Sequence, residues 1–503
     1  MRNLIKSIVT VGGYTLLYRI TSVFRDVLQA KFLGASFLSD VFALVFHLAN
    51  IMRKVFAEGA FNASFLPKFV EVLKNRGRDA AVLFSSQIFT ILFAGVLIFT
   101  AYTLYYFPEF MMFYAPRFVG TEKFVHVVAL GRICFFYVSA SFIFALFSGI
   151  LNGINKFAIP TASQLILNIF LILALIIGAY FDDETIVYGM CYATSLAGLA
   201  QVLILWINAK YHGIKISFKY HVFTPDTKEV FKKMIPGAIG CGVWPINTLL
   251  DMVIAATIGT GATSYLYYTD HISQFILSVL GIALTIGVLP YVATSAKSGD
   301  FKLANSQLNA STIFGMGFAL PLSAIFMAIP ETITSVMYEC GKFDAADVHA
   351  SAPALAAFSF GIPAYILTKI FSTAFFAQGF TKIPSIIGLF SIVVNLSFIY
   401  ILIPYYAHTG IAMATTIAAW FNAFALYVFM VKDGKFSITK SIKIKILKLT
   451  LISVIVAVIS YFIDSYCVEF YTSKLLKGTI LLLNLSFCGA LTYFVGKFTK
   501  SIE

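Results

Sequence analysis

The stretch YRITSVFRDVLQAKFLGA, residues 18–35, is long and apolar enough for part of a membrane helix, yet it carries four charged side chains. A charge at bilayer depth is costly, and such residues usually face a protein interior or a water-filled cavity. The stretch therefore predicts a polytopic membrane protein with a polar chamber beside one of its helices. The four charges are Arg19, Arg25, Asp26 and Lys31.

The rest of the chain has the composition of a membrane protein. Of its 503 residues, 59% are hydrophobic and only 12% are charged, whereas soluble domains contain about 25% charged residues. Apolar runs long enough to cross a bilayer occur about fourteen times, which predicts an all-α fold. These predicted spans lie at approximately 8–32, 36–57, 83–106, 129–152, 159–180, 187–209, 233–258, 265–292, 309–330, 350–376, 383–404, 410–431, 446–464 and 475–496.

The net charge of +13 lies mainly in alternate connections between the predicted spans. One set of connections holds roughly four times as many lysines and arginines as the other, so the positive-inside rule places that set and both termini in the cytoplasm. The basic set includes residues 67–79 and 208–234, and the neutral or acidic set includes 180–189. The charge therefore indicates membrane orientation rather than nucleic-acid binding.

The charged residues of the first two predicted spans leave two interpretations open. Either they line a polar cavity, or they form ion pairs with one another inside the protein. Arg19 and Arg25 are six residues apart, about 240° on a straight helix, so either the helix bends or they line different walls of one cavity. Arg25 with Asp26, and Arg53 with Glu58, are also close enough in sequence to form internal ion pairs. The excess of arginine favours an anionic ligand, because the planar guanidinium binds two phosphate oxygens at once.

Further polar residues lie within the predicted spans. Asn50 and Arg53 are three residues apart and are expected to share a helix face. The run YYTDHISQF contains Asp270 and His271, and a lone carboxylate, Asp251, follows the run WPINTLL. A carboxylate at this depth needs a cation, a proton or an arginine beside it.

No cofactor motif is present in the sequence. The six cysteines form no C-x-x-C pair, so neither a disulfide framework nor a zinc site is predicted. No G-x-x-x-x-G-K-[ST] run occurs, and a P-loop ATP site is therefore not expected. Energy for a transport step would come from the membrane potential or from a gradient of Na⁺ or H⁺.

Several motifs resemble those of one known family. The run RITSVFRDVLQAKFLGASFLSDVFALVFHLANIMRKVFAEGAFNASFLP, residues 19–67, closely resembles the opening of the MurJ (MviN) family of lipid II flippases. The resemblance continues in ILNGINKFAIPTASQLILNI (150–169), YYTDHISQFILSVLGIALTIGVLP (267–290) and YECGKFDAADV (338–348). It covers essentially the whole chain.

The resemblance implies an architecture. Members of this family look like the larger superfamily of multidrug, oligosaccharidyl-lipid and polysaccharide exporters, with two six-helix lobes around a central cavity. Here these correspond to an N-terminal lobe at 1–209 and a C-terminal lobe at 233–431, joined by a cytoplasmic amphipathic linker at 210–232. Two extra helices within 432–503 would form a groove for a polyprenyl tail.

The resemblance also implies a function. Such proteins flip lipid II, the undecaprenyl-pyrophosphate-linked peptidoglycan precursor, from the cytoplasmic to the periplasmic leaflet of the bacterial inner membrane by alternating access. A protein of this kind serves cell-wall biogenesis and cell shape as a monomeric transporter among membrane lipids. It is neither an enzyme nor a nucleic-acid-binding protein. The family's polar cavity positions correspond by motif to Arg19, Arg25, Arg53, Asp40, Asn50, Glu58 and Asp270.

The chain departs from the family pattern at one pair of positions. His271 stands where many members have arginine, and Gln274 replaces a common acid. The paired loss of one base and one acid indicates a deleted salt bridge rather than a lost substrate contact. Some relatives bind sodium in the back lobe, which makes Asp251, Asn395 and Thr415 the predicted sodium ligands here.

Two other functions remain open from the sequence. A transporter of the same superfamily that carries another lipid-linked oligosaccharide, or a drug, would be expected to have fewer arginines in its first two spans. A membrane enzyme acting on polyprenyl phosphates would need a carboxylate pair or an acidic metal motif at the membrane face. The acidic cluster DDET at 182–185 lies on the predicted outer side, which argues against such an enzyme.

Overall fold

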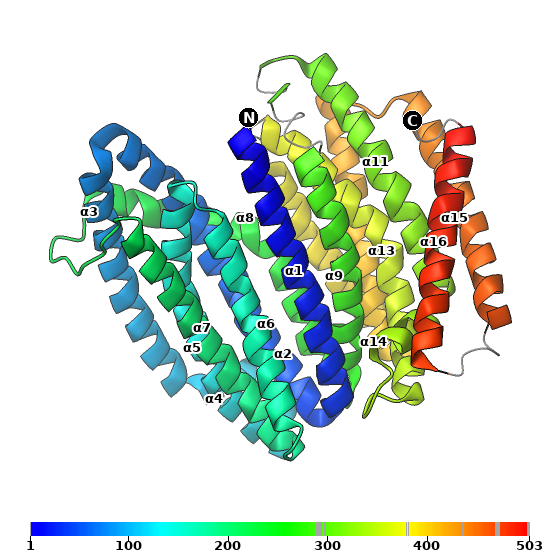
Figure 1. Ribbon diagram of the computed structural model, residues 1–503, viewed down its shortest axis with the longest axis horizontal. Helices are drawn as coiled ribbons and strands as arrows, with labels where there is room; N and C mark the ends of the chain where they lie inside the picture. Colours follow the sequence, from blue (N-terminus) through cyan, green and yellow to red (C-terminus); the bar gives the residue numbers. More distant parts are fainter. Residues whose placement is uncertain are drawn as a thin grey trace. The chain divides into compact units, whose positions relative to one another are not determined.

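The computed structural model consists of helices joined by short connections (Figure 1). Within the described part of the chain, the one β-bridge is isolated and joins Cys340 and Phe343. The predicted all-α fold is therefore confirmed. The residues that the structure describes are 2–287, 294–295, 298–378, 380, 382–434, 436–467 and 473–499.

The chain divides into two compact units, Met1–Ser264 and Tyr265–Glu503. The predicted division into lobes, linker and C-terminal helices stays a prediction. The elements of the first unit are α1 (Arg2–Leu33), α2 (Phe37–Met52), the π-helix η1 (Arg53–Phe61), α3 (Asn62–Tyr105), α4 (Phe107–Tyr114), the 3₁₀ turn η2 (Pro116–Phe118), α5 (Glu122–Gly153), α6 (Ala158–Gly178), α7 (Asp183–Tyr211) and α8 (Pro225–Ala255).

Helix α5 lies at the centre of the first unit. It packs against α2, α3 and α7, and α6 packs in turn against α7 and α1; Figure 1 shows α1 beside α6. Close approach to α5 depends on small residues. A Cβ on Gly149 would lie 2.8 Å from a ring carbon of Phe65 and 3.0 Å from the Asn62 Oδ1 atom. Glycine at this position therefore allows the start of α3 to lie directly against α5.

Helix α3 consists of two arms that fold back on one another. The break is at Gly77, whose φ of 84° is a left-handed conformation that glycine adopts without steric cost. Phe65 and Phe84, on opposite sides of the break, stack with ring centroids 5.7 Å apart. On a straight helix these residues would be about 28 Å apart. The second arm coincides with the predicted span at 83–106.

Charged side chains join the beginning of α8 to the first arm of α3. Arg76 donates hydrogen bonds to the two oxygens of Asp226 at 2.5 and 3.3 Å, and Lys68 Nζ lies 2.9 Å from Glu229 Oε2. The hydrogen bonds from Arg76 lower the pKa of Asp226. Hydrogen bonds from Lys233 and Lys68 lower the pKa of Glu229 to about 2. Both carboxylates are therefore charged at neutral pH and fix where α8 begins.

The segment between α7 and α8 contains residues 214–224, which are not helical. This segment lies along the second arm of α3. The Ser217 N–H donates to Ser86 Oγ at 3.3 Å, and the Lys219 N–H donates to Thr90 Oγ1 at 3.0 Å. Hydroxyl groups on α3 thus satisfy part of the backbone of this segment, which has no helical hydrogen bonds of its own.

The second unit contains long helices that pack against one another, including pairs that are far apart in sequence. Helices α11 and α14 pack on α13, α15 packs on α11, and α16 packs on α15. The elements are α9 (Ala262–Gly287, which begins in the first unit), α11 (Phe301–Ala328), α12 (Pro330–Tyr338), α13 (Ala345–Ala377), α14 (Lys382–Asp433), α15 (Lys440–Cys467) and α16 (Lys474–Phe498).

Helix α14 also consists of two arms. It breaks at Ala407, where φ is 47°, three residues after Pro404. Proline has no N–H to continue the helical ladder. A Cβ on Gly410 would come within 2.9 Å of the Leu402 carbonyl, although eight residues of straight helix extend about 12 Å. The chain therefore turns back sharply, and each arm carries one predicted span.

Every predicted span overlaps a helix within the described residues, and residues 288–292 of the span at 265–292 lie outside them. Among the described residues, nine helices are long and apolar enough to cross a membrane. Two of them, the continuous segment Phe37–Tyr105 and helix α14, each contain two predicted spans. The three other predicted spans lie on α1, α8 and α9. The chain is a multi-pass membrane protein, and the count of about fourteen spans stays a prediction.

Candidate functional site

A polar cavity of about 460 Å³ lies inside the first unit, between α1, α5, α6 and the start of α3. Most of its lining residues are polar, and the one charged residue among them is Arg19. From α1 come Val11, Thr15, Tyr18 and Arg19, and Asn62 comes from α3. From α5 come Phe144, Ser148 and Asn152, and from the beginning of α6 come Phe157, Pro160, Thr161 and Gln164.

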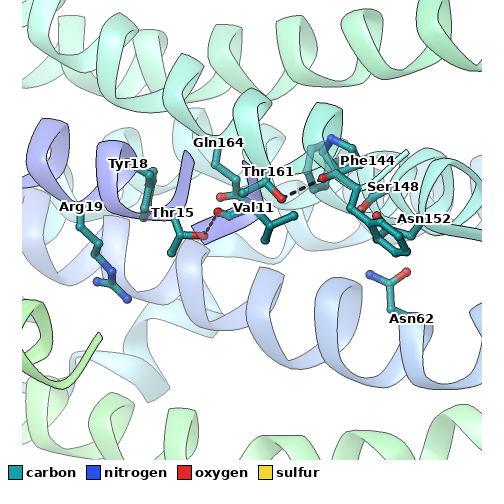
Figure 2. A pocket seen from close by; sticks show the side chains of 12 residues that line it. Val11, Thr15, Tyr18, Arg19, Asn62, Phe144, Ser148, Asn152, Thr161 and Gln164 are labelled. Carbon is teal, nitrogen blue, oxygen red and sulfur yellow. Dashed lines mark hydrogen bonds between the residues drawn. The ribbon is translucent and has the colours of Figure 1, made fainter. Parts of the chain in front are cut away.

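The cavity has a charged end and a neutral end. Figure 2 shows the guanidinium of Arg19 at one end and the side chains of Asn62, Ser148 and Asn152 at the other. Gln164 and Thr161 lie between them in this view. The neutral end is formed where α5 finishes and α3 begins.

Arg19 is a cation without an ion-pair partner among the described side chains. Its Nε atom is buried and makes no hydrogen bond there, and its guanidinium carbon lies 5.9 Å from the centroid of the Tyr18 ring. An arginine held at this depth without a counter-ion leaves its charge available to a ligand. Arg19 therefore borders a polar cavity, and its assignment to substrate binding stays a prediction.

Arg25 is held differently, by neighbours within the protein. It is only 2% exposed, its Nη2 atom lies 2.5 Å from Asp26 Oδ1, and its Nη1 atom donates to Asn168 Oδ1 at 3.2 Å. The guanidinium also lies 5.4 Å from the centroid of the Phe46 ring. Of the two interpretations open from the sequence, the structure has the internal ion pair. The assignment of Arg25 to substrate binding stays a prediction.

Asn168 links this ion pair to the backbone of α1. Its amide nitrogen donates to the Tyr18 carbonyl and to Thr21 Oγ1, both at 3.0 Å. Its oxygen meanwhile accepts the hydrogen bond from Arg25. Helices α1 and α6 are therefore joined by a buried polar network whose residues on α1 all lie within two turns of Arg19.

Asp40 caps a helix. Its carboxylate is buried and accepts hydrogen bonds from the Gly261 N–H at 2.7 Å, the Ser264 N–H at 2.8 Å and Ser264 Oγ at 2.7 Å. Since α9 begins at Ala262, Asp40 satisfies N–H groups at its N-terminus, where a negative charge is also stabilised by the helix dipole. These contacts give Asp40 a structural role, and its predicted contact with substrate stays a prediction.

The predicted pairing of Asn50 with Arg53 on one helix face is confirmed. The Arg53 Nη2 atom lies 3.5 Å from Asn50 Oδ1, and Arg53 is buried. Arg53 is also the first residue of the π-helix η1, a conformation often found at functional sites. Glu58 belongs to the same π-helix, and its side chain lies outside the described part of the structure.

The remaining predicted site residues lie in α8 and in the second unit. Gln274 Nε2 donates to Asp270 Oδ1 at 3.4 Å, and the ring of His271 lies 4.1 Å from that of Tyr267, measured between centroids. Position 274, where the family resemblance implies an acid, thus carries a neutral amide that donates a hydrogen bond to Asp270. Their assignment to substrate binding stays a prediction.

The predicted sodium ligands are buried. Thr415 Oγ1 donates to Asn395 Oδ1 at 3.4 Å across the two arms of α14, and Asp251 is buried in α8. Among the described residues, no group of three or more His, Cys, Asp or Glu side chains could hold a metal ion. The sodium site stays a prediction.

Sequence reasoning missed the neutral end of the cavity. Asn62 lies in the quoted motif at 19–67, and Asn152 and Gln164 lie in the quoted motif at 150–169, but their spacing in sequence gives no indication that they meet. They meet because α3 and α6 both pack against α5, so that the three helices line one cavity together with α1.

Membrane-length helices around a polar cavity that contains Arg19 define a polytopic membrane protein with a polar site inside its helical bundle. Comparison with solved structures identifies the fold. The fold matches a structure described as "Lipid II flippase MurJ, inward closed conformation", with a TM-score of 0.81 and 23% identity, over 97% of this chain and 98% of that one. It also matches an inward-facing multidrug transporter of the MATE family, with a TM-score of 0.71 and 14% identity, over 85% of this chain and 98% of that one.

Sequence comparisons identify the family. A probable lipid II flippase MurJ from Rhizobium tropici is 35% identical over 436 residues, which are 86% of this chain and 82% of the relative. One from Rickettsia prowazekii is 32% identical over 494 residues, 98% of this chain and 97% of the relative. Residues 29–481 match the family described as "Lipid II flippase MurJ". The chain belongs to the lipid II flippase MurJ family.

Proposed function

We propose that this protein moves lipid II from the cytoplasmic to the outer leaflet of the bacterial inner membrane by alternating access, without changing it covalently. Family membership and the names of its relatives support the substrate. The observation within this chain that carries the proposal is Arg19, a cation at a polar cavity with no carboxylate partner among the described side chains.

The diphosphate of lipid II matches the chemistry of Arg19. A guanidinium offers two parallel N–H groups to phosphate oxygens, and hydrogen bonds between charged partners are roughly twice as strong as neutral ones. Binding would replace the water lost by Arg19 on burial with fixed phosphate oxygens. A drug cation would instead be repelled, which distinguishes this site from that of a cationic multidrug exporter.

The other predicted residues take part unequally in this proposal. Arg53, which lies beside Asn50, is assigned to the diphosphate together with Arg19. Arg25 forms a neutral pair with Asp26, so it attracts an anion less strongly and contributes mainly by holding α1 against α6. Asp270 and His271 are assigned to the polar head of the lipid.

Alternating access requires that substrate binding favours one conformation. A ligand shifts a conformational equilibrium only by its differential affinity for the two states. In the proposed cycle, neutralisation of Arg19 and Arg53 by the diphosphate supplies this difference, and both termini remain in the cytoplasm. The protein acts as a monomer, driven by the membrane potential or by a Na⁺ or H⁺ gradient. Unchanged flipping after sodium replacement and in Asp251→Asn would exclude the sodium site.

Reconstitution into liposomes tests the function directly. Fluorescent lipid II placed in one leaflet should become accessible in the other only when the protein is present, and it should be recovered chemically unchanged. The same chain should restore growth to a bacterium depleted of its own flippase. Covalent modification of the lipid would favour a membrane enzyme. Transport of another lipid-linked oligosaccharide, with no transport of lipid II, would favour the other transporter.

Asp40→Ala is expected to destabilise the protein rather than to abolish substrate binding. Removal of the carboxylate leaves the Gly261 and Ser264 N–H groups unsatisfied, at about 1–3 kcal/mol for each buried group. The midpoint of thermal unfolding in detergent should fall, and the Kd for lipid II should stay within about twofold at temperatures where the variant is folded. Asp40→Asn, which retains one acceptor oxygen, should lose less stability. An unchanged midpoint with lost binding would assign Asp40 to the substrate.

His271→Arg is expected to leave flipping unchanged or slightly impaired. The acid that pairs with arginine in the family pattern is replaced by Gln274 in this chain. The introduced charge therefore gains no carboxylate partner at position 274. The initial flipping rate of the variant in liposomes is the measurement, with His271→Gln as the uncharged control. A large increase in rate would mean that the family arginine contacts substrate and that its loss here is not compensated.

A further inference from the structure

The neutral end of the cavity contains a polar atom that the protein leaves unsatisfied. Asn62 Oδ1 is buried and has no hydrogen-bond partner among the described residues. Most buried polar groups in proteins are paired, so an exception needs an explanation. Its position is fixed by close packing, because the Asn62 side chain lies against Gly149 on α5. A hydrogen-bond donor on a ligand would satisfy this oxygen.

A second amide at this end is also available to a ligand. Asn152 Nδ2 reaches Ser148 Oγ only at 3.5 Å, at the limit of a hydrogen bond. Between this end and Arg19, Thr15 and Thr161 donate to carbonyl oxygens at positions 11 and 157, which leaves their oxygen lone pairs free to accept. This end of the cavity therefore combines donors and acceptors and has no charged lining residue.

These features describe the ligand chemically. An inorganic anion would need a cation, and a metal ion would need carboxylates, and neither lines this end. An acyl chain would leave the amides of Asn62 and Asn152 unpaired. An N-acetylated sugar ring fits this end. The hydroxyl groups of the ring both donate and accept hydrogen bonds, and its acetamido group supplies an N–H donor. The C–H faces of the ring can lie on Phe144 and Phe157. Pockets with a few placed polar groups on apolar walls are typical of small-molecule sites.

The two ends of the cavity are close enough for one ligand to occupy both. Along α1, the lining extends from Val11 to Arg19, a rise of about 12 Å. A diphosphate at Arg19 would place a directly attached sugar in the neutral end, with Gln164 between them as Figure 2 shows. We propose that the neutral end, formed by Asn62, Ser148 and Asn152, is a subsite for an N-acetylated sugar ring carried on the diphosphate that Arg19 binds.

This subsite deepens the proposed function, on which it rests, and it has a consequence for selectivity. A polyprenyl diphosphate without sugar would fill only the charged end. The neutral amides would then stay unpaired, so the unloaded carrier should bind more weakly than the loaded one. Sites built to hydrogen-bond a substrate strongly reject analogues that lack the partner groups.

Binding to three lipids tests the proposal on the full-length protein in nanodiscs. The ligands are undecaprenyl diphosphate, the same lipid with one N-acetylated sugar, and lipid II. Wild type should bind both sugar-bearing lipids about tenfold or more tightly than the bare diphosphate, as expected for a few hydrogen bonds. Asn62→Leu and Asn152→Leu should remove this difference and leave the Kd of the bare diphosphate unchanged. Asn152→Ala, with its unfolding midpoint checked, provides a smaller change at the same place.

Controls separate the subsite from the diphosphate site. Arg19→Ala should weaken binding of all three lipids by a similar factor. Asn208→Leu on α7, where the asparagine donates to the Ile204 carbonyl of its own helix and does not line this cavity, should change none of them. Free N-acetylglucosamine should compete far more weakly than the lipids, which assigns the site to the lipid-linked sugar.

Three results would overturn the subsite. One is equal affinity of wild type for loaded and bare lipids, and another is an equal effect of the asparagine variants on all three ligands. The third is unchanged binding in folded asparagine variants. If wild type binds none of the lipids and Arg19→Ala has no effect, the proposed function fails and the subsite fails with it.

Discussion

Replacing Arg19 with alanine is expected to lower both the affinity for lipid II and the initial flipping rate by about 30- to 1000-fold. This corresponds to about 2–4 kcal/mol, the range expected for charge-assisted hydrogen bonds to a diphosphate. Arg19 has no carboxylate partner among the described side chains, so its removal leaves no buried acid unpaired. The protein should therefore keep its unfolding midpoint. Liposome flipping and lipid II binding are the two measurements.

Two further variants on the same helix sharpen this prediction. Arg19→Lys retains the charge but not the planar pair of donors. Its flipping rate and its affinity for lipid II should lie between those of wild type and Arg19→Ala. Lys31→Ala removes the same charge from an exposed residue that lies beside Phe32 and away from the cavity, and it should have little effect. If Arg19→Ala flips lipid II at the wild-type rate, the proposed role of this cavity in transport is wrong.

Asp26→Ala is expected to destabilise the protein strongly. It leaves Arg25 buried without its carboxylate, and removing one partner of a buried ion pair typically costs about 3–5 kcal/mol. Asn168 still accepts one hydrogen bond from Arg25, but a neutral amide does not balance the charge. The midpoint of thermal unfolding in detergent, measured at one scan rate, should fall by several degrees.

The double variant Arg25→Met with Asp26→Leu separates stability from function. Without either charge, the site should recover most of the stability that Asp26→Ala loses, as apolar replacements of buried ion pairs often do. If Arg25 acts mainly by holding α1 against α6, the folded double variant should retain more flipping than Arg19→Ala. Wild-type stability of Asp26→Ala would contradict the structural role. Complete loss of flipping in a stable double variant would assign Arg25 to the substrate.

The positions of the helices could be predicted from the sequence because apolar length alone determines which segments cross a membrane. The sharp breaks that join some of these helices could not be predicted from the sequence. At Gly77 the chain reverses inside a continuous charged segment, and at Ala407 a non-glycine residue adopts a left-handed conformation. Each break depends on packing between the two arms of its helix, such as the stacking of Phe65 on Phe84 in α3. The periodicity of residues along one helix does not indicate such packing.

The site divides in a similar way. The position of Arg19 beside a polar cavity could be predicted because a charge within an apolar run needs a polar surrounding. Arg25 pairs with the adjacent Asp26, as one interpretation of the sequence allowed, but its second partner, Asn168, lies 143 residues away in sequence and could not be predicted. The helix cap made by Asp40 depended on partners more than 200 residues away. Such contacts are properties of the folded bundle, and the family resemblance, which assigned Asp40 to the cavity, did not contain them.

The π-helix η1 sets the rotation of α3, which follows it directly. A π turn accommodates an extra residue compared with an α turn, and each residue of an α-helix corresponds to about 100° of rotation. Asn62, the first residue of α3, follows η1 directly. A shift by a single residue at η1 would therefore rotate Asn62 out of the cavity while Arg19 stayed in place. The wall of the chamber that faces α5 could in this way change its chemistry through local rewinding, without any displacement of a whole helix.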